Sequence, residues 1–258
     1  MSMNKLEKAI SLTMNAHEFD DIQFSGVDAS KSMEEIAKMS FSKVSEKDYL
    51  DRKKIVYPKC SQEKLVNQLR DIRTELSKHQ VKNLVMITSV IDEAGVSFFS
   101  KNIAAVNAFD ASKSSLLIDC NLTSPSVDDT FDLKGKPGLL DYVLNQEIQE
   151  KDIIHEVGIS RYRALPAGNM KAESSEYFTH PRFKKLLFSL KNRYQDRTIF
   201  LDAPPLLDSA DARILVGLCD LVILVLPSGK ISKNKIEAAA KVIPKEKLMG
   251  AIINNNIY

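Results

Sequence analysis

The sequence predicts an α/β fold with a doubly wound, mostly parallel sheet, helices on both faces of the sheet and a polar N-terminal arm. The first observation is an alternation of patterns: from residue 83 onward, short β-rich apolar runs alternate with segments of helical periodicity. The second is that these runs are apolar throughout, where a strand with one solvated face would alternate. Strands buried on both faces and separated by helices indicate a parallel sheet.

The N-terminal arm is expected to span residues 1–60, and the folded domain residues 61–258. The arm is rich in Lys, Asp, Glu and Ser and has only short apolar patches. Leu6, Ile10 and Met14 are spaced to form one apolar face of a helix. The arm is therefore expected to be partly helical or disordered.

The folded domain begins with a charged helix, "SQEKLVNQLRDIRTELSKH", in which Ser61 is the expected N-cap and Glu63 lies in the first turn. Six strands are predicted after it, at 84–89, 115–119, 163–167, 198–202, 221–227 and 248–254. Helical patterns between them cover roughly 97–110, 138–146, 181–194, 209–217 and 232–242. Ligands of such sheets bind at the carboxyl ends of the strands, so the residues there are the ones to examine for function.

Composition argues against several classes of function. The chain carries a formal net charge of +2, which gives no indication of a nucleic-acid partner or of an anionic membrane surface. The three cysteines are far apart and the four histidines show no ligand spacing, which favours reduced thiols in a cytoplasmic protein over disulfides or a zinc site. No apolar run approaches the length of a membrane span, so we expect membrane association only through a partner.

Two predicted strands end in an aspartate. "LLIDCNLTSPSV" places Asp119 at one strand end, and "TIFLDAPPLLDSADA" places Asp202 at another. A third loop, "MITSVIDEAGVSFFSKNIA", runs from a strand into a helix and offers the hydroxyl of Ser97. A lone aspartate in such a place is more often a helix cap or turn residue. Two carboxylates and a hydroxyl at matching strand ends instead favour a hard-oxygen site for Mg²⁺ beside a polyphosphate, so these three residues are the predicted metal ligands.

Several further blocks follow in one order: "MITS", "SKNIA", "LLIDCNLTSPS", "ALPAG", "THPRFKKLLFSLKNRYQDRTIFLDAPP", "DARILVGLCDLVILVLPSGKIS" and "MGAIINN". On these blocks the chain, from about residue 63 to its C-terminus, resembles the cytoplasmic kinase domain of the bacterial tyrosine autokinases (BY-kinases). Those kinases belong to the capsular and exopolysaccharide ATPase family, a relative of the ParA/MinD ATPases. The resemblance implies a P-loop fold, the use of ATP with Mg²⁺, and tyrosine autophosphorylation.

The loop departs from the family's nucleotide-binding pattern. Gly95 and Ser97 match it, whereas Glu93, Val96 and Phe98 stand where the family has a glycine, the phosphate-binding lysine and a second threonine. The lysine neutralises phosphate oxygens in the ground and transition states, and valine has neither charge nor donor. The added carboxylate is also unfavourable, since two like charges ~4 Å apart repel by about 4 kcal/mol at an effective dielectric constant of about 20. We therefore expect weak binding of ATP or ADP with Mg²⁺, or none.

The second strand end has also lost charge relative to the family, which carries Asp-x-Asp followed by two arginines. Asp119 matches the first aspartate, while Asn121, Thr123 and Ser124 replace the other three residues. Asp202 is kept. The two aspartates are therefore expected to support only vestigial or weak catalysis.

Asn254 and Lys101 also bear on the nucleotide site. Asn254 ends the last predicted strand; its counterpart in the wider ATPase family helps to hold the adenine, and a turn residue is an equally good interpretation. Gly95, Val96, Ser97 and Asn254 are the predicted nucleotide-binding positions. Lys101 lies one helical turn beyond Ser97 and would have to reach back to replace the missing lysine, which we do not expect.

The first helix of the domain and the C-terminus bear on assembly. In the family, a helix with the pattern E-x-x-R-x-x-R forms rings; here Arg70 and Arg73 match, and Asn67 stands at the acidic position. Residues three apart share a helix face, so both arginines can meet a partner, although a solvated basic edge is nearly as good an interpretation. The family's C-terminal tyrosine cluster corresponds to Tyr258 alone, a candidate phospho-acceptor or an end residue without a role.

The resemblance and its departures lead to one expected function and two alternatives. The expected function is that of a catalytically impaired BY-kinase homologue in exopolysaccharide or capsule synthesis and export. It would bind a membrane polysaccharide copolymerase or an active tyrosine kinase, form homo-oligomers, and be cytoplasmic, at the periphery of the inner membrane through that partner. The first alternative is an active ATP-dependent tyrosine autokinase, supported by Ser97, Asp119 and Asp202. The second, a ParA/MinD-type positioning ATPase, is disfavoured by the "LPAG" and "PRF" blocks.

Overall fold

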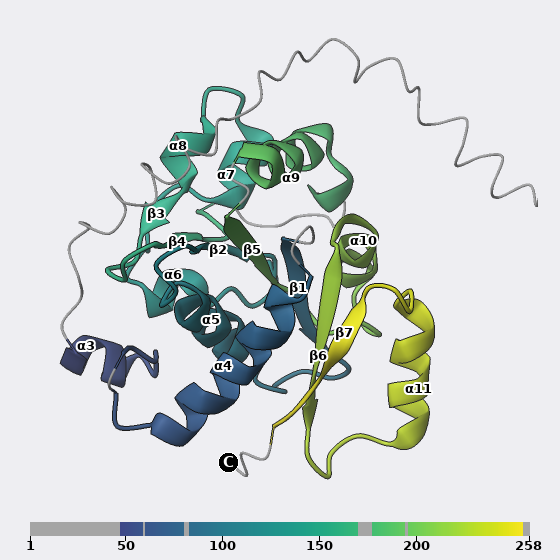
Figure 1. Cartoon of the computed structure of the whole chain (residues 1–258). Helices are drawn as coiled ribbons and strands as arrows, with labels where there is room; N and C mark the ends of the chain where they lie inside the picture. The colour runs from purple at the N-terminus through teal and green to yellow at the C-terminus, as the bar shows by residue number, and fades with distance from the viewer. Residues whose placement is uncertain (1–46, 59, 80–82, 170–176, 194–195, 255–258) are drawn as a thin grey trace, which may run out of the picture.

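The structure is a computed structural model that describes residues 47–254, apart from residue 59 and the stretches 80–82, 170–176 and 194–195 (Figure 1). The helix predicted near the N-terminus and Tyr258 lie outside the described residues.

Among the described residues, seven strands form one sheet in the order β3-β4-β2-β5-β1-β6-β7. Every neighbouring pair is parallel except β3 and β4, which are antiparallel. The fold class predicted from the sequence is thereby confirmed. The strands are β1 (Leu84–Ser89), β2 (Ser114–Asp119), β3 (His155–Glu156), β4 (Tyr162–Leu165), β5 (Arg197–Asp202), β6 (Leu221–Pro227) and β7 (Leu248–Asn254).

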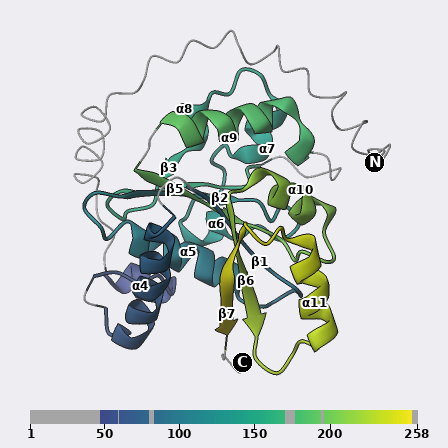
Figure 2. The same ribbon diagram turned by 45° about the vertical axis from the view of Figure 1, so that its right-hand side comes forward.

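Helices cover both faces of the sheet, with α4 and α5 on one side and α9 and α10 on the other (Figure 2). The first face is covered by α3 (Lys47–Arg52), α4 (Glu63–Ser77), α5 (Val96–Asn107) and α6 (Val127–Thr130). The second is covered by α7 (Leu139–Leu144), α8 (Glu150–Ile153), η2 (Tyr177–Thr179), α9 (Pro181–Arg193), α10 (Ala210–Leu218) and α11 (Lys233–Val242). Of the helices in the described ranges, none combines the length and the apolar character needed to cross a bilayer.

Successive residues of the central strand β1 point to opposite faces of the sheet. Val85 and Ile87 belong to the apolar cluster beneath α3–α6, and Leu84 and Met86 to the cluster beneath α7–α11. All four side chains are buried. Burial on both faces explains why the strands are apolar throughout.

The strand order brings three loops to one edge of the sheet. Strand β5 lies between β1 and β2, and Asp119 at the end of β2 is in register with Asp202 at the end of β5. Asp202 is also in register with Ile87 of β1, so the loop after β1 begins close to both aspartates. The strand ends that the sequence singles out therefore lie together.

Helix α3 falls in the segment for which the sequence predicts only a partly helical or disordered arm. Leu50, Ile55 and Val56 are buried and pack in the cluster beneath α3–α6. Their packing partners are distant in the sequence, so local periodicity could not indicate them. The boundary expected at residue 61 thus lies within a unit whose packing begins at α3.

The start of α4 differs by one residue from the expectation. Its N-cap is Gln62, not Ser61, and no side-chain hydrogen bond caps this end. Cys60 is buried and holds the chain just before the helix, while Ser61 is exposed. Ser61 is therefore one position too early for its hydroxyl to accept from the first-turn N–H groups.

Candidate functional site

The loop between β1 and α5 has a left-handed backbone at one position that matches the family's sequence pattern and at one that departs from it. Gly95 has φ of 92° and Glu93 has φ of 56°, both in the left-handed region. Glycine enters this region without strain, whereas a side chain such as that of Glu93 costs about 1–2 kcal/mol. Glutamate thus adopts, at a position where the family has a glycine, a conformation that glycine enters more easily.

Helix α5 begins at this loop with its first N–H groups uncapped by any side chain. Gly95 is the N-cap, and the first turn carries no acidic residue. Such an end has free donors and the positive end of the helix dipole, which together favour a phosphate. The backbone contribution to anion binding is therefore present.

The side chain at the lysine position serves packing. Val96 is partly buried against the apolar cluster beneath α3–α6, and Phe98 packs against the same cluster. Phe98 also makes an edge-to-face contact with Phe99, their ring centroids 5.3 Å apart. Two positions at which the family has phosphate-site residues thus contribute to the core.

Asp119 is fully buried and accepts three backbone hydrogen bonds from the loop that follows β2. Its Oδ1 accepts from the Asn121 N–H at 3.2 Å, and its Oδ2 accepts from the N–H groups of Ser126 at 2.8 Å and Val127 at 2.9 Å. Burial, and then the neighbouring charge of Asp202, raise the pKa of this carboxyl, while the three N–H groups oppose the rise. The turn and cap role that the sequence left open is therefore realised.

Asp202 is equally buried but less well satisfied. The Ser100 hydroxyl lies 3.3 Å from its Oδ1, whereas its Oδ2 has no hydrogen-bond partner among the described residues. Burial raises the pKa of Asp202, and the Ser97 hydroxyl, the charge of Lys101 and the Ser100 hydroxyl oppose the rise. An acceptor without a donor is costly in such a place, so this oxygen is suited to a proton or a cation.

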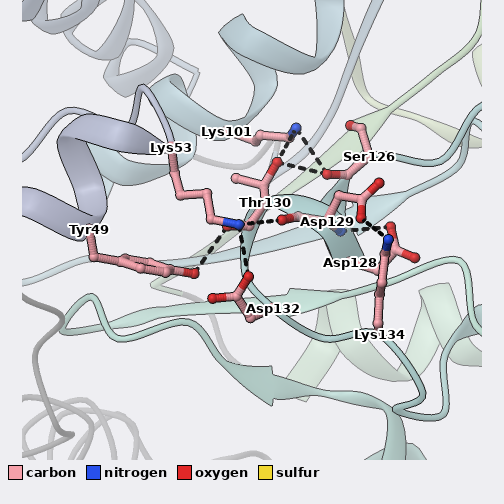
Figure 3. A network of polar contacts seen from close by, with 9 residues as sticks. All are labelled: Tyr49, Lys53, Lys101, Ser126, Asp128, Asp129, Thr130, Asp132 and Lys134. Atoms are coloured by element: carbon pink, nitrogen blue, oxygen red, sulfur yellow. Dashed lines mark hydrogen bonds and ion pairs between the residues drawn. The ribbon is translucent and has the colours of Figure 1, made fainter.

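The side chain of Lys101 reaches α6 and its N-cap residue Ser126 (Figure 3). Its Nζ donates to the Ser126 carbonyl at 3.1 Å and to the Thr130 hydroxyl at 2.7 Å. Burial lowers the pKa of this amine, and the charges of Asp202 and Asp119 oppose the fall. The expectation that Lys101 does not replace the missing lysine agrees with these contacts.

The residues present fit a magnesium ion in part. The Ser97 hydroxyl and the unpartnered Oδ2 of Asp202 are hard-oxygen donors of the kind that Mg²⁺ prefers. Asp119 is already committed to three N–H donors, which leaves it less suited to bind metal directly. No group of three or more His, Cys, Asp or Glu in the described part of the chain could hold a metal, so an ion here would depend on waters or phosphate oxygens as well.

Asn254, at the end of β7, contacts the loop between β1 and α5. Its Nδ2 donates to the Ala94 carbonyl at 3.0 Å. The same atom would lie 2.6 Å from a Cβ added at Gly95, so the loop and the end of β7 are in close contact. The role of Asn254 in holding adenine stays a prediction.

The two arginines of α4 do not present one surface. Arg70 is exposed and donates to Asn67 Oδ1 at 3.1 Å, whereas Arg73 is half-buried and donates to the Val106 carbonyl at 3.4 Å. Arg73 also lines a cavity of about 180 Å³ near Asn83 and Arg197, at the amino ends of β1 and β5. Ring formation through this helix stays a prediction.

Sequence reasoning missed the polar contacts of α5. Ser100, Lys101 and Asn102 are three successive buried polar residues in a mainly apolar helix, a pattern that signals specific partners. Their partners, such as Thr130 for Lys101, come from distant segments, and their identities could not be read from the sequence.

Comparison with known proteins gives the family. No family model matches the chain. The tyrosine-protein kinase YwqD of Bacillus subtilis is 34% identical over 193 residues, covering 72% of this chain and 79% of that protein. The tyrosine-protein kinase CpsD of Streptococcus agalactiae serotype III is 30% identical over 210 residues, covering 80% of this chain and 89% of that protein.

Solved structures agree with these relatives. The VpsO kinase domain superposes with a TM-score of 0.63 at 26% identity, covering 74% of this chain and 98% of that one. The septum site-determining protein MinD of Pyrococcus horikoshii, complexed with Mg-ADP, has a TM-score of 0.51 at 19% identity over 67% of this chain and 70% of that one, a likeness of fold alone. The sheet order, the paired strand-end aspartates and the kinase relatives agree, and the chain belongs to the family of bacterial tyrosine-protein kinases.

Proposed function

We propose that this chain is a catalytically impaired member of its family that acts through binding in exopolysaccharide or capsule synthesis. Its partner would be a membrane polysaccharide copolymerase or an active tyrosine kinase. The observation that carries the proposal is the side chain of Val96, which packs into the apolar cluster at the position of the phosphate-binding lysine.

The electrostatics of the loop support impairment. Phosphoryl transfer depends on positioning and on positive charge around the transferred group. Glu93 is exposed in the loop and adds negative charge there, while the ammonium of Lys101 is bound to α6. Removing one favourable charge contact at ~4 Å and adding an unfavourable one amounts to several kcal/mol, or about 10³-fold or more in affinity.

The remaining parts of the site have definite roles if a nucleotide does bind. The uncapped N–H groups at the start of α5 would bind phosphate oxygens. Ser97 and Asp202 would hold Mg²⁺, which when bound supplies charge neutralisation to those oxygens. Asp119 would hold the loop after β2 in place through its three N–H contacts.

An active autokinase is the second candidate, and one observation favours it. The backbone is left-handed at Glu93 and Gly95, and backbone turns of this kind can direct N–H groups toward an anion, although Glu93 is strained in that conformation. Retained strain of this kind is frequent at functional sites.

The test is nucleotide binding by thermal shift with ATP and Mg²⁺. The wild type is compared with Val96→Lys/Glu93→Gly and with a control of similar side-chain length but no charge, Val96→Met/Glu93→Gly. We expect no shift for the wild type and the control at millimolar nucleotide, and a shift for the lysine variant. Micromolar binding by the wild type, with radiolabel from ATP appearing on a tyrosine of the chain, would instead establish the kinase.

A further inference from the structure

Lys101 is a buried amine placed among four carboxylates. Its side chain is almost fully buried, and the acids that face it are Asp202, Asp119, Asp128 and Asp129. Asp129 is itself paired with Lys134 at the surface, whereas the first two are fully buried. The ionised form of a buried carboxylate pair is stabilised by a nearby positive charge, and Lys101 is the buried cation whose charge acts on Asp202 in the described part of the chain.

The amine and the acid pair are joined through one residue of the loop before α6. The Ser126 carbonyl accepts from Lys101 Nζ and, at 2.7 Å, from the Thr130 hydroxyl. The N–H of the same residue donates to Asp119 Oδ2 at 2.8 Å. The position of this loop therefore depends on both the lysine and the aspartate.

Asp202 gives independent evidence that positive charge is favourable beside the acid pair. Its Oδ2 is fully buried and has no hydrogen-bond partner among the described residues. Such an oxygen is stabilised by a proton or by positive charge nearby. Lys101 lowers the cost of that oxygen electrostatically, although its own hydrogen bonds go to α6.

We propose that Lys101 is a positioning residue that supplies from within the chain the positive charge which the acid pair would otherwise take from a divalent cation. The inference rests on the proposed function, because a site that does not turn over nucleotide can keep a permanent charge in place of an exchangeable one. It follows that the loop before α6 is held in one position with or without Mg²⁺.

The experiment measures thermal unfolding of the full chain in millimolar MgCl₂ against NaCl of matched ionic strength. Three variants are compared with the wild type: Lys101→Met, Lys101→Arg, and Lys101→Met/Asp202→Asn. We expect no response of the wild type or of Lys101→Arg to Mg²⁺. Lys101→Met should melt about 10 °C lower, because a buried acid pair loses its compensating charge, and Mg²⁺ should recover a large part of this loss. In the double variant, both the decrease in melting temperature and its recovery by Mg²⁺ should be smaller.

Three outcomes would overturn the inference: a wild type that Mg²⁺ already stabilises, a Lys101→Met variant that Mg²⁺ does not rescue, or a double variant that melts as low as Lys101→Met. If Lys101→Met is unfolded without Mg²⁺, refolding on addition of MgCl₂ is followed by circular dichroism, and no refolding counts against the inference. Nucleotide is absent throughout. The result is therefore independent of the ATP-binding test, and either proposal can fail alone.

Discussion

The loop between β1 and α5 and the strand-end acid pair, Asp119 and Asp202, lie at the same edge of the sheet. They differ in how they depart from the family's sequence pattern. The loop has left-handed backbone conformations at Glu93 and Gly95, but it has no cationic side chain at position 96. The acid pair keeps its charged groups, but both carboxyls are fully buried and Asp119 is used in hydrogen bonds to its own loop. The two regions show that a loop with a left-handed backbone and a buried acid pair can lie at one sheet edge without a cationic side chain at position 96.

The largest expected effect tests whether the two aspartates have different roles. Asp119→Asn should lower the free energy of unfolding by about 3 kcal/mol, because an amide cannot accept all three N–H groups without turning a donor toward one of them. Asp202→Asn should change it by less than about 1 kcal/mol, because the amide keeps the acceptor near Ser100 and removes a buried charge. Urea unfolding at pH 8 measures both. Equal losses would show that the two carboxyls act as one unit.

A smaller effect tests whether the loop shape depends on glycine at position 95. Gly95→Ala should cost about 2 kcal/mol: about 1 for the left-handed backbone and about 1 for displacing the Asn254 amide from the Ala94 carbonyl. Gly229 is the matched control, since it has φ of +72° and nothing within 4 Å of an added Cβ. Gly229→Ala should cost only the backbone share. A loss at Gly95 no larger than that of the control would mean that Asn254 does not hold the loop.

The last prediction concerns pH and tests the burial of the acid pair. Because both carboxyl pKa values are raised in the folded chain, the folded state holds more protons than the unfolded state above the ordinary carboxyl pKa of 3.8. Their contribution to stability is therefore complete below pH 3.8 and is lost as the pH rises toward about 7, the raised pKa of Asp119. We expect the free energy of unfolding to fall steadily as the pH rises from 5 to 8, measured by urea unfolding.

Asp202→Asn is the control for this pH dependence. The substitution removes one titrating group and the like charge that raises the pKa of Asp119. The free energy of unfolding should therefore change less steeply with pH. An unchanged slope in the variant would assign the pH dependence to other groups.

The strands of the sheet and the positions of Asp119 and Asp202 at strand ends could be predicted because both depend on short-range patterns. Continuous apolar runs mark strands buried on both faces, and an aspartate directly after such a run lies at the carboxyl edge of a parallel sheet. The register that sets the two residues side by side follows once β5 is placed between β1 and β2.

Other features could not be predicted because long-range packing determines them. Glutamate disfavours the left-handed backbone that it adopts at position 93, so its conformation is set by the surrounding fold. The partners of Lys101 are 25 and 29 residues away along the chain. Helix α3 has six residues, too few for a periodic pattern to be distinct, and its stability comes from tertiary contacts.

The contacts of helix α3 with α6 have a consequence for where the folded unit begins. Tyr49 donates to the Thr130 carbonyl at 3.1 Å, and Lys53 donates to the Asp129 carbonyl and to Asp132 (Figure 3). An expressed fragment that starts at residue 61 would uncover apolar core and free one end of α6. In the intact chain, Tyr49 and Lys53 connect α3 to the same short helix that binds Lys101, so α3 and Lys101 hold α6 from two sides.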